Sequence, residues 1–321
     1  MIHIAGGEMV RDSDDRWEVD ESVGATALGA AAVRAYESAA GSPLFVDPYA
    51  QRFLDAAAER GMTVTHGGRM PEDFSDSDPA LVEFVQTMTN YAATRTKCFD
   101  DFVVNAAVAG VRQFVILAAG LDTRAWRLDA LRGCSVFEID QPEVLRFKEA
   151  ALGPKVVPVA YDTSVPIDLR GDWPKALRAA GFQQSDPTAW SAEGLLPYLP
   201  PEAQGSLFDR IDGLSASGSR LIVDVYRPEF YGDAALEQAF EQLDRAARSG
   251  LEADGDDGRI YQKDLFFTGE RIDVSAWLRE RGWEVSVLPS VDAMAALGRP
   301  AAASVSADAL SSDFVEAKRL D

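Results

Sequence analysis

VILAAGLDTRAWRL, residues 115–128, is the stretch that decides the fold. An apolar strand runs into a turn of small residues, Ala118-Ala119-Gly120, and a helix-like segment follows at 122–132. Small residues in such a turn let a ligand approach the backbone closely, and the helix that follows offers free N–H groups. FVILAA is apolar almost without interruption, which is typical of a central strand buried on both faces.

Outward from this turn, short apolar runs alternate with helix-like segments. The runs are RQFVILAA (112–119), SVFEID (135–140), KVVPVAY (155–161), PTAWSAE (187–193) and SRLIVDVY (219–226). The helix-like segments are 122–132, 142–152, 174–181 and 201–214. Strands and helices that alternate at this spacing predict an α/β protein with a doubly wound parallel sheet and helices on both faces. WEVSVLPS and FVEAKRLD predict further strands near the C-terminus.

The sequence before this sheet is expected to form an N-terminal helical extension, residues 1–110. Its helices are predicted at 19–40, 47–61 and 79–110, with Asp47 and Pro48 opening the second and Gly110 closing the third. The core is expected to span 111–321 and to carry an inserted lid at 228–270, within a single structural domain overall.

Net charge narrows the choice of partners. Lys and Arg number 31 against 52 Asp and Glu, which gives −21 at pH 7 with His neutral. A surface this negative repels phosphate backbones and anionic lipid heads, and no run of Lys or Arg offsets it, so we expect no nucleic acid partner. Because there is no apolar stretch of roughly 18 residues and no signal-peptide pattern, we expect a cytoplasmic protein without membrane insertion.

Histidine and cysteine are scarce, which limits the chemistry. The two histidines, His3 and His66, cannot form a metal cluster with Cys98 and Cys134 at any known spacing, so we expect no metal. A Ser-His-Asp hydrolase would need one of these two histidines as its base, and no Gly-x-Ser-x-Gly elbow accompanies them.

The turn and the next strand point to a nucleoside-containing cofactor. Glu138 and Asp140 follow Gly120 by about twenty residues, where an acidic side chain accepts hydrogen bonds from ribose hydroxyls. A dinucleotide would need G-x-G-x-x-G, whereas this turn has one glycine and then Asp122, whose charge repels a pyrophosphate. A sulfonium cofactor is positively charged and tolerates Asp122. The turn therefore favours methyl transfer over an NAD-dependent oxidoreductase.

Five segments in the right order resemble the leucine carboxyl methyltransferase-like family, in its actinobacterial, mycobacterial-type branch. They are YAATRTKCFDDF (91–102), AAGLDTRAWRL (118–128), FEIDQPEVLRFK (137–148), DLRGDWPKALRAAGF (168–182) and PTAWSAEGLLPYLPPEAQ (187–204). The resemblance implies a seven-stranded class I methyltransferase (Rossmann-like) sheet, and S-adenosyl-L-methionine as the cofactor.

The resemblance also implies a role for each residue of the cofactor site. These are Arg95 at the methionine carboxylate, Ala118 and Gly120 in the turn, Asp140 at the ribose, Asp168 and Leu169 beside the adenine, and Glu193 at the amino group. Many family members have Gly where this chain has Ala118. Asp162 also lies near the end of a predicted strand, so either Asp162 or Asp168 is the adenine-side residue; spacing from Asp140 favours Asp168.

The scarcity of histidine also limits the kind of acceptor that we expect. A hydroxyl acceptor needs a base to take its proton, whereas a carboxylate is already ionised at pH 7 and needs only positioning and desolvation. The family name points the same way, so we expect carboxyl O-methylation by in-line displacement without a dedicated base. A hydroxyl O-methyltransferase with an Asp or Glu base, and a non-catalytic cofactor-binding protein, are the alternatives.

The acceptor is expected beyond the carboxyl ends of the strands, under a lid made by the N-terminal helices and residues 228–270. Aromatic residues in that insertion either form an apolar pocket for a small carboxylic acid, such as a fatty-acid-like lipid, or pack the lid on the sheet: Phe230, Tyr231, Phe240, Tyr261, Phe266 and Phe267. Tyr198 and Tyr226 are candidate substrate contacts, and Arg227 is a candidate partner for an acceptor carboxylate.

Overall fold

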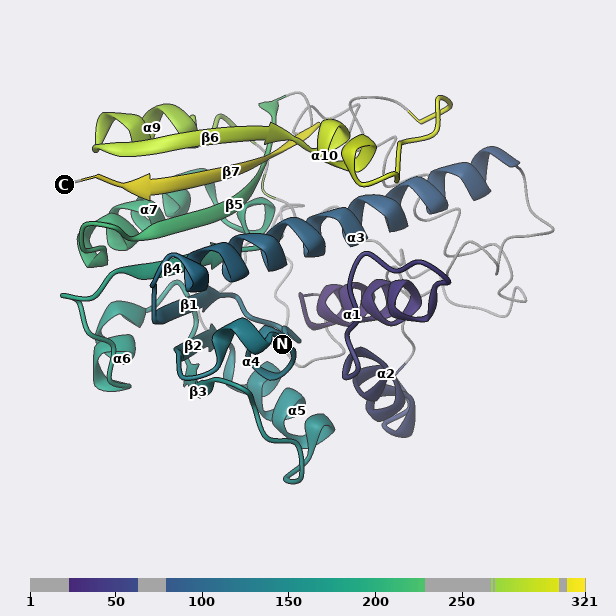
Figure 1. Ribbon diagram of the computed structural model, residues 1–321, viewed down its shortest axis with the longest axis horizontal. Helices are drawn as coiled ribbons and strands as arrows, with labels where there is room; N and C mark the ends of the chain where they lie inside the picture. The colour runs from purple at the N-terminus through teal and green to yellow at the C-terminus, as the bar shows by residue number, and fades with distance from the viewer. Residues whose placement is uncertain (1–22, 63–78, 229–266, 268, 306–310, 321) are drawn as a thin grey trace, which may run out of the picture.

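The computed structural model describes residues 23–62, 79–228, 267, 269–305 and 311–320. The strands are β1 (Gln113–Leu117), β2 (Ser135–Asp140), β3 (Tyr161–Pro166), β4 (Thr188–Ala192), β5 (Arg220–Tyr226), β6 (Trp283–Pro289) and β7 (Ser312–Arg319). They form one sheet in the order β3-β2-β1-β4-β5-β7-β6 (Figure 1). β1 to β5 pair in parallel, and β7 runs antiparallel to both of its neighbours. The predicted parallel sheet is confirmed for β1 to β5.

Helices cover both faces of this sheet. They are α1 (Val23–Ala39), α2 (Ala50–Glu59), α3 (Pro79–Val108), α4 (Arg124–Arg127), α5 (Pro142–Leu152), α6 (Trp173–Ala179), α7 (Pro201–Leu214), α9 (Val274–Glu280) and α10 (Ser290–Ala296), with 3₁₀ turns η2 (Asp129–Leu131) and η3 (Leu196–Tyr198). None of the helices in these ranges is both long and apolar enough to span a membrane.

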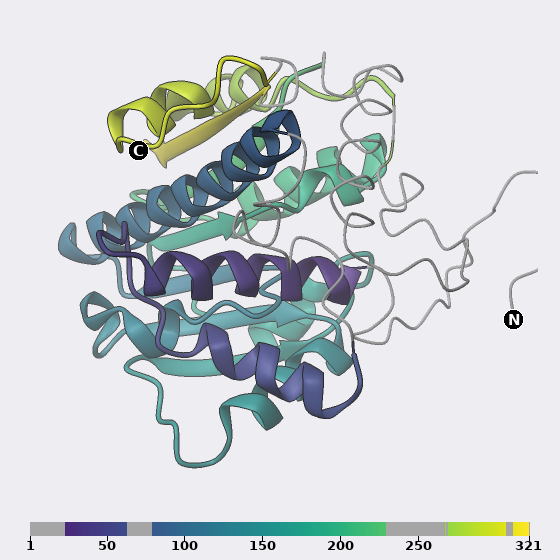
Figure 2. The same cartoon turned by 90° about the vertical axis from the view of Figure 1, so that its right-hand side faces the viewer.

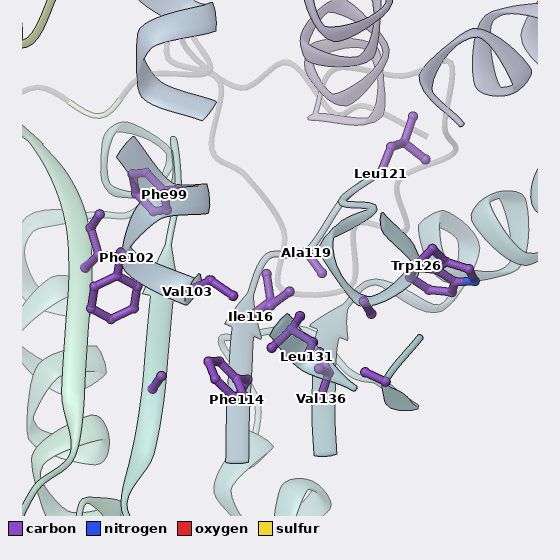
Figure 3. Close-up of a cluster of buried hydrophobic side chains, with 14 of the residues drawn as sticks. Phe99, Phe102, Val103, Phe114, Ile116, Ala119, Leu121, Trp126, Leu131 and Val136 are labelled. Atoms are coloured by element: carbon purple, nitrogen blue, oxygen red, sulfur yellow. The ribbon is translucent and has the colours of Figure 1, made fainter. Parts of the chain in front are cut away.

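The core has two halves, one on each side of the sheet. Phe114 and Ile116 of β1 pack with residues of α3, α5 and α10, while Val115 and Leu117 pack with residues of α6, α7 and α9. Figure 3 shows the first half, where side chains of α3 meet those of β1 and β2. Side chains alternate across a strand, so a strand buried on both faces is apolar along most of its length, as Phe114 to Leu117 of β1 are. Gln113, the first residue of β1, is polar and buried, and its side-chain amide donates to Thr188 Oγ1 at 2.8 Å and to the Gln183 carbonyl at 2.9 Å.

The N-terminal segment contributes a layer that reaches the carboxyl end of β1. α1 lies between α2 and α3 in both views (Figures 1 and 2) and packs on each of them. Arg34 of α1 ties the layer to the turn after β1, because its guanidinium donates to Asp47 Oδ2 at 2.8 Å and to the Leu121 carbonyl at 2.6 Å. Thr123 donates to the same Asp47 oxygen at 2.7 Å. α1 is thereby held over the turn that the sequence singled out.

The third predicted strand was misplaced. KVVPVAY, 155–161, is not a strand, and β3 is the more polar stretch YDTSVP that begins at Tyr161. β3 is an edge strand, so part of its surface faces solvent, and Tyr161 is 71% exposed. An apolar run is not required there, and Pro158 interrupts the run that was predicted.

Other predicted boundaries shift by a few residues. The second helix begins at Ala50 and not at Asp47, although the Asp47 carboxylate does accept hydrogen bonds from the N–H groups of Tyr49 and Ala50. The helix predicted at 122–132 is the short α4 followed by η2. The predicted lid at 228–270 lies largely outside the described residues, as do five of its six aromatic residues, so its role remains a prediction.

Candidate functional site

The turn after β1 is fastened to the end of β2. The N–H of Gly120 donates to Asp140 Oδ2 at 2.6 Å, and the N–H of Gln141 donates to Asp140 Oδ1 at 2.6 Å. Burial raises the pKa of Asp140, and these two backbone donors oppose the rise. Asp140 does not cap α5, whose N-cap is Gln141. Its carboxylate instead joins the carboxyl ends of two neighbouring parallel strands.

Left-handed backbone conformations shape this turn. Gly120 has φ of 51° and Ala118 has φ of 50°. Ala118 is a non-glycine residue at a position where glycine avoids a steric cost of about 1 kcal/mol. A Cβ on Gly120 would lie 3.4 Å from the Cβ of Ala27 on α1. The turn therefore passes close beneath α1, and the small residues on both sides keep space open.

A cavity of about 190 Å³ lies over the turn. Its lining includes α1 residues Thr26, Ala27 and Ala30, the turn residues Ala118 to Asp122, and Arg95, Arg124, Asp140, Glu193 and Tyr198. Five of the seven predicted cofactor residues are therefore brought together: Arg95, Ala118, Gly120, Asp140 and Glu193. These positions come from α3, the β1 turn, β2 and the loop after β4.

Glu193 lies between two guanidinium groups. Arg95 Nε is 3.0 Å from Glu193 Oε1, and Arg124 Nη1 is 2.9 Å from Glu193 Oε2. Burial acts to raise the pKa of Glu193, but the charges of Arg124 and then Arg95 outweigh it and hold this pKa below its usual value. The Glu193 carboxylate is therefore ionised at neutral pH, although it is largely withdrawn from water.

Both guanidiniums are themselves fixed by further carboxylates. Arg124 donates to Asp100 Oδ1 at 2.7 Å and pairs with Asp122. Arg95 Nη1 lies 3.6 Å from Asp224 Oδ2. Asp224 is fully buried in β5, and its Oδ1 accepts a hydrogen bond from the N–H of Gly194 at 2.7 Å. The result is a chain of alternating charges that runs from β5 across the cavity to α4.

The two candidates for the adenine side lie at opposite ends of β3. Asp162 is the second residue of the strand, pairs in register with Val136, and has its pKa raised to about 6 by burial. Asp168 lies two residues beyond the carboxyl end, where its Oδ2 accepts from Gln141 Nε2 at 2.7 Å. Of the two, Asp168 is therefore the one at the edge of the sheet where the carboxyl ends of the strands, Asp140 and the turn lie. Asp168 and the adjacent Leu169 do not line the cavity itself.

Of the three predicted substrate contacts, Tyr198 is the one that lines the cavity. Tyr198 lines the cavity, and burial raises its pKa while a hydrogen bond with Thr26 of α1 opposes the rise. The Tyr226 hydroxyl lies 3.3 Å from that of Tyr91, and the lining does not include it. Arg227 forms a two-point ion pair with Asp313, at 2.6 and 3.0 Å, so its guanidinium has an internal partner where an acceptor carboxylate was expected.

Sequence reasoning missed Arg124, Asp224 and the small residues of α1. Asp224 could have been found from the sequence, because a lone carboxylate in the apolar run RLIVDVY needs a buried partner. Arg124 stands in the decisive motif, yet no local pattern shows that Asp100 and Glu193 converge on it. Within the described part of the chain, no group of three or more His, Cys, Asp or Glu side chains is placed to hold a metal ion.

Comparison with known proteins identifies the family. The sequence model described as "Leucine carboxyl methyltransferase" matches residues 27–212. The chain belongs to the leucine carboxyl methyltransferase family. A relative from Mycobacterium avium (strain 104), named "Putative S-adenosyl-L-methionine-dependent methyltransferase", is 46% identical over 310 residues, which are 96% of this chain and 98% of the relative. A relative of the same name from Mycobacterium marinum (strain ATCC BAA-535 / M) is 43% identical and covers 97% and 100% of the two chains.

A solved structure supports the architecture. A DUF574 family protein from Streptomyces avermitilis MA-4680 superimposes with a TM-score of 0.52 at 15% identity, covering 90% of this chain and 96% of that one. At that identity the likeness shows the fold alone. The predicted family and the predicted seven-stranded class I methyltransferase fold are confirmed, and the methyltransferase relatives carry the predicted cofactor, S-adenosyl-L-methionine, in their names.

Proposed function

We propose that this methyltransferase transfers the methyl group of S-adenosyl-L-methionine to a carboxylate oxygen of a small, fatty-acid-like or lipid acceptor. One observation carries the choice of a carboxylate. Among the described residues that line the cavity, the carboxylates are Asp122, Asp140 and Glu193, and each of these three is already bound to arginine or to backbone N–H groups. None of the three is poised to accept a proton from a hydroxyl acceptor, and an ionised carboxylate has no proton to give up.

The residues present fit the cofactor's chemical groups. Its amino-acid part is a zwitterion, and the cavity presents a guanidinium, Arg95, beside a carboxylate, Glu193. Its ribose hydroxyls need an acceptor, which Asp140 supplies at the carboxyl end of β2. A close backbone approach needs small side chains, and Ala27, Ala118 and Gly120 provide them. We assign Asp168 and Leu169 to the adenine side, because both follow the carboxyl end of β3, the strand next to β2.

The chain's own contribution to the reaction is binding, orientation and exclusion of water. When bound, S-adenosyl-L-methionine supplies a methyl carbon activated by the adjacent sulfonium. Arg95 and Glu193 fix the amino-acid part, Asp140 fixes the ribose, and α1 shields the turn from solvent. The acceptor carboxylate then needs to be held in line with the methyl carbon and stripped of water, which is catalysis by proximity and desolvation.

A matched pair of acceptors tests this proposal. Fatty acids and fatty alcohols of the same chain length are incubated with the enzyme and the cofactor, and the products are identified by mass spectrometry. We expect methyl esters from the acids, which alkali hydrolyses, and no methyl ethers from the alcohols. Methyl ethers in the absence of esters would overturn the carboxylate assignment and leave the methyltransferase assignment standing.

A further inference from the structure

Arg124 lies at the junction of three acidic side chains. Its Nε donates to Asp100 of α3 at 2.7 Å, and its Nη1 contacts both Asp122 of the turn and Glu193 of the loop after β4. The Arg124 side chain is 3% exposed. A buried arginine with several charged partners has little freedom to move, because each partner would lose its compensating charge.

Arg95, the other arginine that contacts Glu193, is expected to change partners when the cofactor binds. On the proposed function, Arg95 takes the cofactor's carboxylate and Glu193 takes its ammonium group. Both groups are paired with each other in this structure, Nε to Oε1 at 3.0 Å. In this scheme, binding of the zwitterion opens this pair, with the cofactor's carboxylate at Arg95 and its ammonium at Glu193.

We propose that Arg124 is the positioning residue that makes this exchange workable. It holds Glu193 by Oε2 and leaves Oε1 free to exchange the Arg95 guanidinium for the cofactor's ammonium. Arg124 does not touch the cofactor in this scheme; it acts through Glu193. The inference rests on the proposed function, because the roles of Arg95 and Glu193 come from it.

Arg124 also controls the charge state of Glu193. Among the described residues, the titratable or charged groups that act on Glu193 are Arg95 and Cys98 of α3, Asp122 of the turn, Arg124 of α4 and Asp224 of β5. Arg124 and Arg95 are the cations in this set. Burial raises the pKa of the Cys98 thiol to about 12, so it is neutral. Once Arg95 has turned to the cofactor, Arg124 is the arginine that still contacts Glu193, and together with the cofactor's ammonium it keeps Glu193 ionised against burial and against the charge of Asp122.

The test measures binding of S-adenosylhomocysteine by calorimetry between pH 5.5 and 7.5. In Arg124→Gln, Glu193 loses a cation and its pKa rises. Affinity relative to the wild type should then fall as the pH is lowered, by about tenfold per pH unit below the new pKa. At each pH the affinity of the variant is divided by that of the wild type. This ratio cancels the effect of groups that titrate alike in both proteins, Asp140 included.

Arg127→Gln is the matched control. The Arg127 side chain is as buried as that of Arg124 and binds the same Asp100, with both Nη atoms at 2.6 Å. Its ion pairs are with Asp100 and Asp47, and not with Glu193. Loss of this buried pair should lower the melting temperature without adding a pH slope. An equal slope in both variants, or none in Arg124→Gln, would overturn the proposal.

Arg124→Lys serves if the Gln variant does not fold. Lysine keeps the charge but lacks the planar fork that reaches Asp100 and Glu193 together. In this variant we expect the ratio of its affinity to the wild-type affinity to stay constant with pH. S-adenosylhomocysteine should bind several-fold more weakly than to the wild type, whereas 5′-methylthioadenosine, which lacks the amino-acid part, should bind as it does to the wild type. Equal loss of both ligands, or loss of neither, would overturn the positioning role. Failure of the wild type to bind S-adenosylhomocysteine would instead contradict the proposed function.

Discussion

At the scale of single residues, the position of a carboxylate along its strand decides what it can contact. Asp162 and Asp168 are both candidate neighbours of the adenine in the sequence, and spacing from Asp140 favours Asp168. Moving the strand to Tyr161–Pro166 places Asp162 at its amino end, while Asp168 follows its carboxyl end. Ligands of doubly wound sheets bind at the carboxyl ends of the strands, so the corrected boundary favours Asp168, as the spacing does, and its place beside the adenine stays a prediction.

This difference gives a prediction with a built-in control. Asp168→Asn removes a charged acceptor from the cofactor side and should weaken S-adenosylhomocysteine binding by about tenfold, the size of one charge-assisted hydrogen bond. Asp162→Asn makes the same chemical change at the other end of β3 and should leave binding within about twofold. Calorimetric titration of both variants at pH 7.5 measures this, and a larger loss in Asp162→Asn would refute the assignment.

The residues of the site differ in how far sequence can predict them. Asp140 is found because it follows Gly120 by about twenty residues at the end of the next strand, and Glu193 is found through the resemblance to the family. Arg124 cannot be found in that way, since its role depends on Asp100, 24 residues earlier, and on Glu193, 69 residues later. Long-range convergence of charges follows from how α3 and the loop after β4 pack, and a local pattern does not contain it.

At the scale of elements, apolar periodicity predicts buried strands well and edge strands poorly. β1 is buried on both faces and its five residues are all buried, so its pattern is unambiguous. β3 is at the edge and is largely polar, so the nearby run KVVPVAY was mistaken for it. Helices were predicted nearly to their observed ends where they are long, as α3, α5 and α7 are, and poorly at the short α4.

The helix α1 offers a prediction of its own. Thr26, Ala27 and Ala30 line the cavity from this helix, and Ala30 is half-buried there. In Ala30→Leu the larger side chain enters the cavity, so S-adenosylhomocysteine binding should weaken by about tenfold or more, while helix propensity and thermal stability change little. Ala39→Leu is the control, because Ala39 is exposed at the end of the same helix. Equal affinity in the two variants would show that α1 does not border the ligand.

At the scale of the whole molecule, one sheet brings the carboxyl ends of its parallel strands to a shared candidate site. The turn after β1, the end of β2 and the loop after β4 meet there because β2, β1 and β4 are neighbours in the strand order. Family membership and the sheet agree on a methyltransferase. We expect residues 228–270, most of which lie outside the described part of the chain, to contribute to the choice of acceptor.

Calorimetric titration of the wild-type protein with S-adenosylhomocysteine tests the central claim most directly, with NADH and ATP as controls. We expect one site of micromolar affinity for S-adenosylhomocysteine and no binding of NADH or ATP. We also expect loss of the site in Asp140→Ala, which removes both the proposed ribose acceptor and the partner of the Gly120 N–H. Binding of NADH without binding of S-adenosylhomocysteine, or undiminished binding in Asp140→Ala, would contradict the central claim.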